Sequence, residues 1–206
     1  MMADTSSPYG LRPVKRVDGL PWTNSIETYL INPAGHTGNI FNGQVVALDT
    51  NGYIVVMPSL GSAADQFDAG TIGVFVGCEY VNSEGRIVHS QYYPSGTTGV
   101  VKAKVVSDPN VMFQAQCDGS ATQAALGANI HFTAVQIDGS NVSDGSTFTG
   151  NSASKLDISE AASTATFGFR IVGFVDSVDS SVGDNFTDVL VKFNQGYHSY
   201  TSATGV

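Results

Sequence analysis

The chain has 206 residues, which is enough for one sizeable hydrophobic core or for two small lobes. Charged residues make up 13% and apolar residues 42%, a composition that excludes coiled coils, long helices and intrinsically disordered chains. The formal net charge of −9 disfavours broad binding to nucleic-acid phosphates. Residues 1–107 carry eight acidic residues against six Lys and Arg, and residues 108–206 carry ten against three. We therefore expect the first half to face an acidic partner and the second half to face solvent.

The sequence has no feature of a targeting or membrane segment. The start, M-M-A-D-T-S-S-P-Y-G, lacks the apolar region of a signal peptide. No apolar run approaches the roughly 18–20 residues that span a bilayer. We expect synthesis in a cytoplasm and no membrane partner. Cys78 and Cys117 are expected to be free, partly buried thiols because small disulfide scaffolds contain far more cysteine, although spacing alone leaves their pairing open.

Residues 1–35 are predicted to form an extended N-terminal arm, with one short strand at Ile26–Ile31. Four prolines break the arm, and each removes an amide donor and favours extended backbone before it. Trp, Tyr and Arg dominate the energies of protein interfaces. The arm carries a set of such anchors and cations: Tyr9, Leu11, Arg12, Pro13, Lys15, Arg16 and Trp22. These residues pack either on the chain's own body or on a neighbouring subunit or partner.

The body, residues 36–206, begins with a predicted hairpin. Phe41–Leu48 and Tyr53–Met57 are its strands, and Asn51-Gly52 supplies residues that accept a tight turn. Residues 59–69 are predicted to form a loop. Apolar, β-branched runs then predict a central strand and three further strands: Gly70–Tyr80, Arg86–Tyr93, Gly99–Ser107 and Val111–Cys117.

The second half continues the same alternation of short strands and polar turns. Residues 118–128 are expected to contain one short helical turn, and Ser154–Ser163 fits either a strand or a short helix. Long polar or acidic loops are predicted at 138–153 and 176–187. The strands are predicted at Asn129–Ile137, Phe167–Val175 and Asp188–Asn194. Frequent short strands with Gly, Pro and Asn turns predict an all-β fold, a β-barrel or β-sandwich of short antiparallel strands.

Features recur in the same order in the two halves of the body. Phe75-Val76 can be set over Phe174-Val175, and a glycine precedes an apolar strand at both Gly43 and Gly127. One interpretation is a pseudo-repeat with halves 36–120 and 121–206. The other is chance similarity, because β-proteins rich in Val and Gly resemble themselves.

Catalytic and cofactor motifs are absent from the sequence. The four histidines, His36, His89, His131 and His198, lie in no zinc-ligand spacing, and there is no nucleophile elbow or phosphate-binding loop. The chain is therefore predicted not to be an enzyme and to need no cofactor. Four clustered aspartates fit either a solvated acidic turn, which we favour, or a Ca²⁺ site: Asp176, Asp179, Asp184 and Asp188.

At residues 7–22, S-P-Y-G-L-R-P-V-K-R-V-D-G-L-P-W, the sequence resembles virion structural proteins of marine tailed bacteriophages. The resemblance continues through I-F-N-G-Q-V-V, I-G-V-F-V-G, the Q-Y-Y-P run and D-G-S-x-x-Q-x-A-L-G-A. It also covers F-R-I-V-G-F-V-D and F-T-D-V-L-V-K-F-N, so it spans most of the chain. These motifs are structural patterns, and none carries a functional residue with an agreed role.

Within that class, a small all-β chain without catalytic motifs is similar to capsid decoration (cement) proteins. The resemblance implies a location on the outer surface of the virion capsid, with major capsid protein and further copies of itself, as a homotrimer, for partners. Its arm would then contact the capsid through Tyr9, Leu11, Arg12, Pro13, Lys15, Arg16 and Trp22. The alternative is a head-fibre or tail-associated adhesin that binds host surface glycan.

Overall fold

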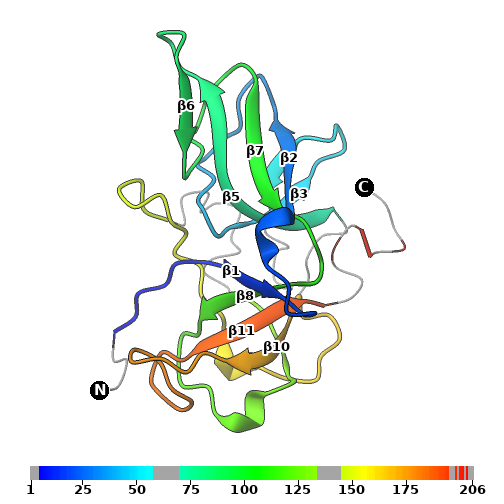
Figure 1. Ribbon diagram of the computed structural model, residues 1–206, viewed down its shortest axis with the longest axis vertical. Coiled ribbons are helices and arrows are strands. Elements are labelled where there is room, and N and C mark those ends of the chain that lie inside the picture. Colours follow the sequence, from blue (N-terminus) through cyan, green and yellow to red (C-terminus); the bar gives the residue numbers. More distant parts are fainter. Residues whose placement is uncertain are drawn as a thin grey trace.

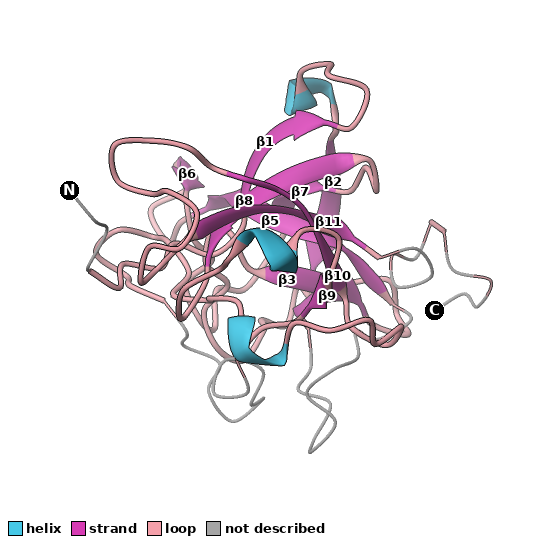
Figure 2. Cartoon of the chain, turned by 90° about the horizontal axis from the view of Figure 1, so that it is seen from below, coloured by secondary structure: helices cyan, strands magenta, loops and turns pink. Residues whose placement is uncertain are grey.

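The computed structural model describes residues 5–57, 70–133 and 145–194, together with residues 198, 200, 201 and 203. In this part of the chain the protein is all-β, as predicted, with two sheets that form two stacked lobes (Figure 1). Helix is confined to single 3-10 turns beside the strands, as Figure 2 shows. They are η1 (Trp22–Asn24), η2 (Gln123–Ala125) and η4 (Ile158–Glu160).

The first lobe is a small barrel. Its strands are β2 (Ile26–Ile31), β3 (Val45–Leu48), β4 (Ile54–Val56), β5 (Thr71–Val81), β6 (Ile87–Ser90) and β7 (Val101–Val106). The sheet order is β3-β4-β2-β7-β5-β6, and β3 also pairs with β5, which closes the ring and leaves β6 as a hairpin arm of β5. All its pairings are antiparallel except β2–β4, which are parallel at Ile31 and Ile54.

The second lobe contains β1 (Arg12–Arg16), β8 (Val111–Gln116), β9 (Asn129–Ile130), β10 (Phe169–Phe174) and β11 (Asp188–Phe193), in the order β1-β8-β11-β10-β9. A single residue, Leu156, closes this sheet. It bridges in parallel to Cys117, just after β8, and antiparallel to Phe132, just after β9. This copies the first lobe, where β4 pairs in parallel with β2 and antiparallel with β3.

The two lobes repeat one topology. Neighbouring strands run β3-β5-β7-β2 in the first lobe and β9-β10-β11-β8 in the second, so the order of the strands along the chain is also the same. The pairing of β5 with β7 has a bulge between Phe75 and Gly77. The pairing of β10 with β11 has its bulge between Ile171 and Gly173.

The hydrogen bonds around the bulges repeat as well. Gly43 N donates to Phe75 O at 2.8 Å, and Gly127 N donates to Ile171 O at 3.0 Å. This equivalence sets Phe75 over Ile171, whereas the sequence alignment set it over Phe174. The chain passes between the sheets in the segment from Val106 to Val111, so β8 lies with the second lobe although the proposed repeat halves divided at residue 120.

Several predicted elements agree with the structure and others are shorter. The strand at Ile26–Ile31 and the helical turn within 118–128 are confirmed. The strand predicted at Arg86–Tyr93 is limited to Ile87–Ser90. That predicted at Asn129–Ile137 pairs only at its start, and its last four residues lie outside the described part, as does the predicted loop 59–69.

Candidate partner-binding site at the lobe junction

Three segments far apart in the sequence meet between the lobes. Leu11 N donates to Gly43 O at 2.9 Å, which joins the arm to the first lobe. Asn42 N donates to Gly150 O at 3.0 Å, and Ser152 N donates to Asn42 O at 2.8 Å. These bonds tie the arm, the segment just before β3 and the loop around residue 151 into one platform.

Glycine is required at position 10 for this close approach. Gly10 has a φ of +73°, and a Cβ there would lie 2.7 Å from Gly43 O and 2.8 Å from Ser152 Cβ. Any side chain would push the arm away from both lobes. The path of the arm at the junction therefore depends on Gly10.

A pocket of about 240 Å³ opens on this platform. Its lining consists of Tyr9, Leu11, Arg12, Pro13 and Trp22 from the arm, with Asn42, Val76 and Asn151 from the lobes. Val76 is the extra residue of the β5 bulge, and bulges commonly turn a side chain away from the regular pleat. The pocket combines an apolar floor with amide, aromatic and cationic groups at its rim.

Arg12 and Tyr9 form the polar side of the pocket. The Arg12 guanidinium lies 4.6 Å from the centroid of the Tyr9 ring, a cation–π geometry. The Tyr9 hydroxyl is buried, and burial together with the negative charge of Asp188 raises the pKa of Tyr9. Tyr9 is therefore neutral at physiological pH, and its ring holds Arg12 at the rim.

Asp188 is itself held from two sides. Its Oδ2 accepts from Gln114 Nε2 at 2.8 Å, and its backbone N–H donates to Ser180 Oγ at 2.8 Å. Gln114 also pairs in register with Arg12 across β8 and β1. The second lobe thus pairs with the backbone of Arg12 and places the charge of Asp188 near Tyr9.

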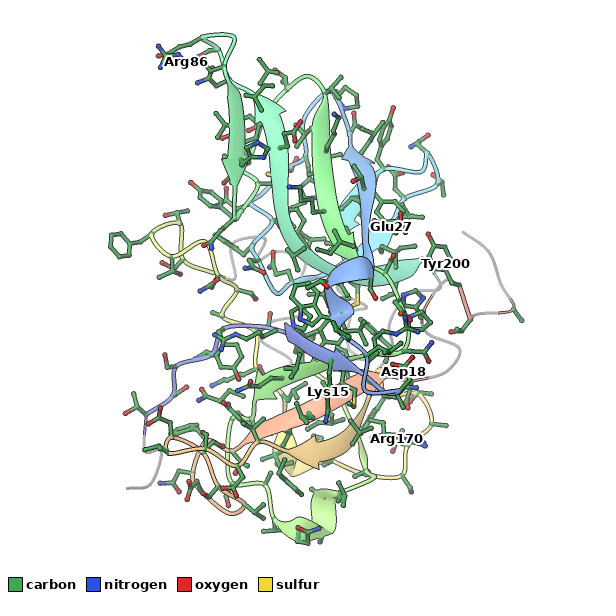
Figure 3. The ribbon with its side chains drawn as sticks, in the orientation of Figure 1. Lys15, Asp18, Glu27, Arg86, Arg170 and Tyr200 are labelled. Atoms are coloured by element: carbon green, nitrogen blue, oxygen red, sulfur yellow. The ribbon has the colours of Figure 1, made fainter. Side chains whose placement is uncertain are left out.

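The remaining predicted cations lie along β1. Arg16 is paired within the chain, at 3.3 Å from Asp18 and 3.2 Å from Asp108. Lys15 is exposed and has no ion pair among the described residues. Figure 3 shows Lys15 and Asp18 beside the junction. Neither Lys15 nor Arg16 lines the pocket, and of the three predicted cations of the arm, Arg12 and Lys15 are exposed whereas Arg16 is partly buried.

The arm packs on the chain's own body in this structure. Leu11 is 1% exposed and belongs to the buried cluster of the second lobe, and Trp22 packs against the same cluster. β1 pairs antiparallel with β8, with a bulge at Val14. Of the seven predicted contact residues, five surround the pocket, while Lys15 and Arg16 lie beyond it.

Sequence reasoning missed Asn42, Val76 and Asn151 as members of the site. Val76 lay within the strand that was recognised as central, and the glycines around it in G-V-F-V-G are the signal of a bulge. Asn42 and Asn151 reach the pocket only through the bridge between their own segments. No local pattern indicates that bridge.

Other titratable groups form no second centre in the described part of the chain. No group of three or more His, Cys, Asp or Glu able to hold a metal ion occurs there, so Asp176, Asp179, Asp184 and Asp188 are not gathered into one. Cys78 and Cys117 are free and buried, one in each lobe, and burial raises the pKa of each thiol to about 12. No helix among the described residues is long and apolar enough to cross a membrane.

Comparison with known proteins gave no relative: no protein-family model, no curated protein and no solved structure matches the chain.

Proposed function

We propose that this protein is a decoration (cement) protein of a tailed-phage head, which binds the outer capsid surface and stabilises contacts between major capsid protein subunits. One observation supports it above the others. Of the seven residues expected to contact a partner, five line one pocket and Lys15 is exposed nearby; the five are Tyr9, Leu11, Arg12, Pro13 and Trp22. A pocket with aromatic and Arg groups at a fixed junction has the composition of an interface hot spot.

The mechanism is lattice bridging. An apolar side chain of a capsid subunit would enter the pocket, while Arg12 and Lys15 meet acidic groups around it. Many copies on one particle add their contacts, so a modest affinity per copy suffices. Self-association, as a homotrimer, would increase the number of capsid contacts that each unit makes.

Particle imaging at a resolution that traces the chain tests the location. Density on the outer capsid, with residues 8–22 against a neighbouring subunit, is the expected result. Density at the tail or at isolated vertices would overturn the proposal and favour the glycan-binding adhesin, for which saturable sugar binding would be the next measurement.

Binding of purified variants to phage heads that lack the protein tests whether Arg12 and Lys15 make the contact. The variant Arg12→Ala/Lys15→Ala should bind such heads more weakly than wild type, while its melting temperature stays close to that of wild type. Arg86→Ala is the matched control because Arg86 is a strongly exposed cation at the far end of the first lobe (Figure 3). Wild-type attachment by the double variant at raised salt would exclude this surface as the contact.

A further inference from the structure

A second pocket, of about 360 Å³, lies on the outer side of the second lobe beside β10 and β11. Arg170 and Lys192 face each other across these strands, and Asn129, Ala165, Phe193 and Asn194 line the space around them. Only three Lys or Arg follow residue 107 in this acidic half, and two of them are in this pocket. Two like charges directly opposite each other weaken a strand pair, and an anionic ligand bound between them would remove that repulsion.

Hydrogen bonds orient the guanidinium of Arg170. Neither Arg170 nor Lys192 has an ion pair within the described residues. Arg170 Nε donates to Asn129 Oδ1 at 2.9 Å, and the amide of the buried Asn129 donates in turn to Thr164 O at 2.9 Å. These two hydrogen bonds hold the guanidinium of Arg170 in place. Its terminal nitrogens are left for a carboxylate, the group whose geometry the planar guanidinium matches.

The first lobe, which has the same topology, shows what residues at these two strand positions do there. Val74 and Val106 are the first-lobe residues equivalent to Arg170 and Lys192, by their positions relative to the two bulges. Both valines are fully buried and belong to the cluster that continues into the second lobe. At these two positions the first lobe packs an apolar pair against protein, and the second lobe carries two cations instead.

The molecule also carries a group of complementary charge. The turn after β10 exposes Asp176 and Asp179 on either side of Val178, which is 84% exposed. Its backbone is fixed by the bond from Ser177 N to Ser180 O at 2.8 Å. Two carboxylates around an apolar side chain match, in charge, two cations beside the exposed Ala165.

One molecule cannot satisfy its own pocket. The turn connects the end of β10 to the start of β11, whereas the pocket lies at the start of β10 and the end of β11. The six residues of each strand separate the two by roughly 17–20 Å. We propose that the Arg170–Lys192 pocket binds the acidic turn Asp176–Asp179 of a second copy of this chain, in a head-to-tail contact. Such a contact closes into a ring or continues as a filament, and it stands whether or not the protein binds a capsid.

The test is self-association of the full chain, measured by sedimentation velocity over a range of concentrations at low and high salt. Wild type should associate, and more weakly at high salt. Arg170→Gln/Lys192→Gln and Asp176→Asn/Asp179→Asn should each weaken association about tenfold or more, because each removes both charge pairs. Lys15→Gln/Arg86→Gln, which removes two cations outside the pocket, should not.

A charge exchange makes the test decisive. Arg170→Glu/Lys192→Glu and Asp176→Lys/Asp179→Lys should each fail to associate alone, and an equimolar mixture of the two should associate again. All four side chains are at least partly exposed, so circular dichroism should report an unchanged fold. A monomeric wild type at the highest concentration, or a mixture that stays monomeric, would overturn the proposal. Loss of association only in the pocket variants would show that the pocket takes a different acidic group.

Discussion

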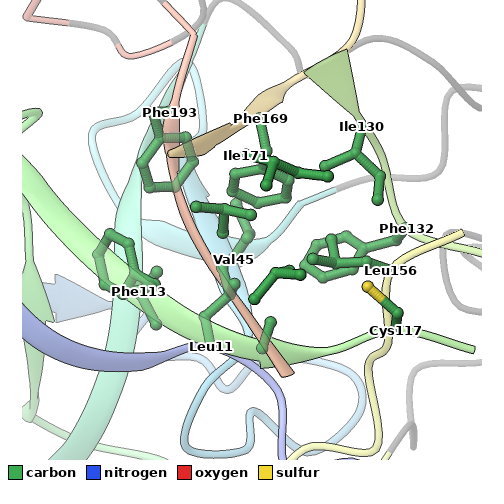
Figure 4. Packing of buried hydrophobic residues seen from close by; sticks show 14 of the residues in the cluster. Leu11, Val45, Phe113, Cys117, Ile130, Phe132, Leu156, Phe169, Ile171 and Phe193 are labelled. Carbon is green, nitrogen blue, oxygen red and sulfur yellow. The ribbon is translucent and has the colours of Figure 1, made fainter. Parts of the chain in front are cut away.

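The buried clusters of the two lobes differ in where their residues come from. Every member of the first cluster lies between Ile31 and Val105, within the first lobe itself. The second cluster includes Leu11 from the arm and four residues from the first lobe: Val45, Met57, Val74 and Val106. Figure 4 shows Val45 and Leu11 among Phe113, Ile171 and other side chains of the second lobe. The same topology thus gives one lobe with its own core and one whose core is completed by its neighbour.

This difference predicts that the second lobe needs the first lobe in order to fold, whereas the first lobe does not need the second. The outer face of β3, β5 and β7 covers the core of the second lobe, and the arm covers the edge of β8. Removing the first lobe therefore removes part of the second core, whereas removing the second lobe only uncovers an outer surface of the first.

Separating the lobes has the largest expected effect. A fragment of residues 108–206 should lack cooperative unfolding, because five side chains of its cluster lie outside it. A fragment of residues 17–107 should fold, although its uncovered valines should promote association. Thermal unfolding followed by circular dichroism distinguishes them. A cooperative transition in the isolated fragment of residues 108–206 would show that the core of the second lobe forms without the first lobe.

A single buried side chain in each lobe gives a finer comparison. Leu11→Ala and Ile54→Ala each remove a buried side chain and should lower the free energy of unfolding by about 2–5 kcal/mol. Leu11→Ala should speed alkylation of Cys117 more than that of Cys78, and Ile54→Ala should do the reverse, since each thiol is buried in the corresponding cluster. Peptide mapping by mass spectrometry measures both thiols. Equal acceleration of both would mean that the lobes open as one unit.

The sequence was most informative where the signal is local. The alternation in Gly99–Ser107 predicts β7, because a strand with one buried face leaves a pattern of period two. The β-branched run at Gly70–Tyr80 predicts β5, which is buried on both faces over most of its length. Closure of the second lobe by Leu156, and pairing of the arm with β8, leave no pattern because they join residues distant in sequence. For the site, residue type identified the arm anchors, whereas Asn42, Val76 and Asn151 depend on a bulge and a bridge.

Acid should weaken the junction. His198 is buried beside Phe193, and burial lowers its pKa from 6.5 to about 4. The unfolded chain then binds a proton at a higher pH than the folded chain does. The stability that neutral His198 provides is complete above pH 6.5 and is lost as the pH falls toward 4, by on the order of 2–3 kcal/mol. Melting temperatures of wild type and His198→Gln between pH 7.5 and 4.5 test this, with exposed His89→Gln as control. An unchanged pH slope in His198→Gln would contradict it.

The two bulges offer a matched pair of glycines. Gly77 has a φ of +135°, and a Cβ there would lie 2.9 Å from Ser90 O, so Gly77→Ala should cost about 1–3 kcal/mol. The equivalent Gly173 has room, with Leu190 Cδ1 at 3.5 Å, so Gly173→Ala should change stability by about 0.5 kcal/mol or less. Denaturant unfolding measures both, and similar losses would show that the bulges are under the same constraint.

The smallest effect concerns the ion pair that links the arm to the connection between the lobes. Asp108 pairs with Arg16 at 3.2 Å and also accepts from Ser25 Oγ at 3.2 Å, so one carboxylate holds β1 and the segment before β2. Both partners of the pair are partly exposed, and Arg16→Gln should therefore cost about 0.2–1 kcal/mol, less at high salt. The more exposed Arg86–Glu84 pair, 3.5 Å apart at the tip of the first lobe, is the control, and Arg86→Gln should have no measurable effect.

Because the Arg16 pair lies where the arm, the first lobe and β8 meet, its loss should speed alkylation of Cys117 before it changes that of Cys78. Equal rates for the two thiols in Arg16→Gln would show that the arm does not stabilise the second lobe through this contact.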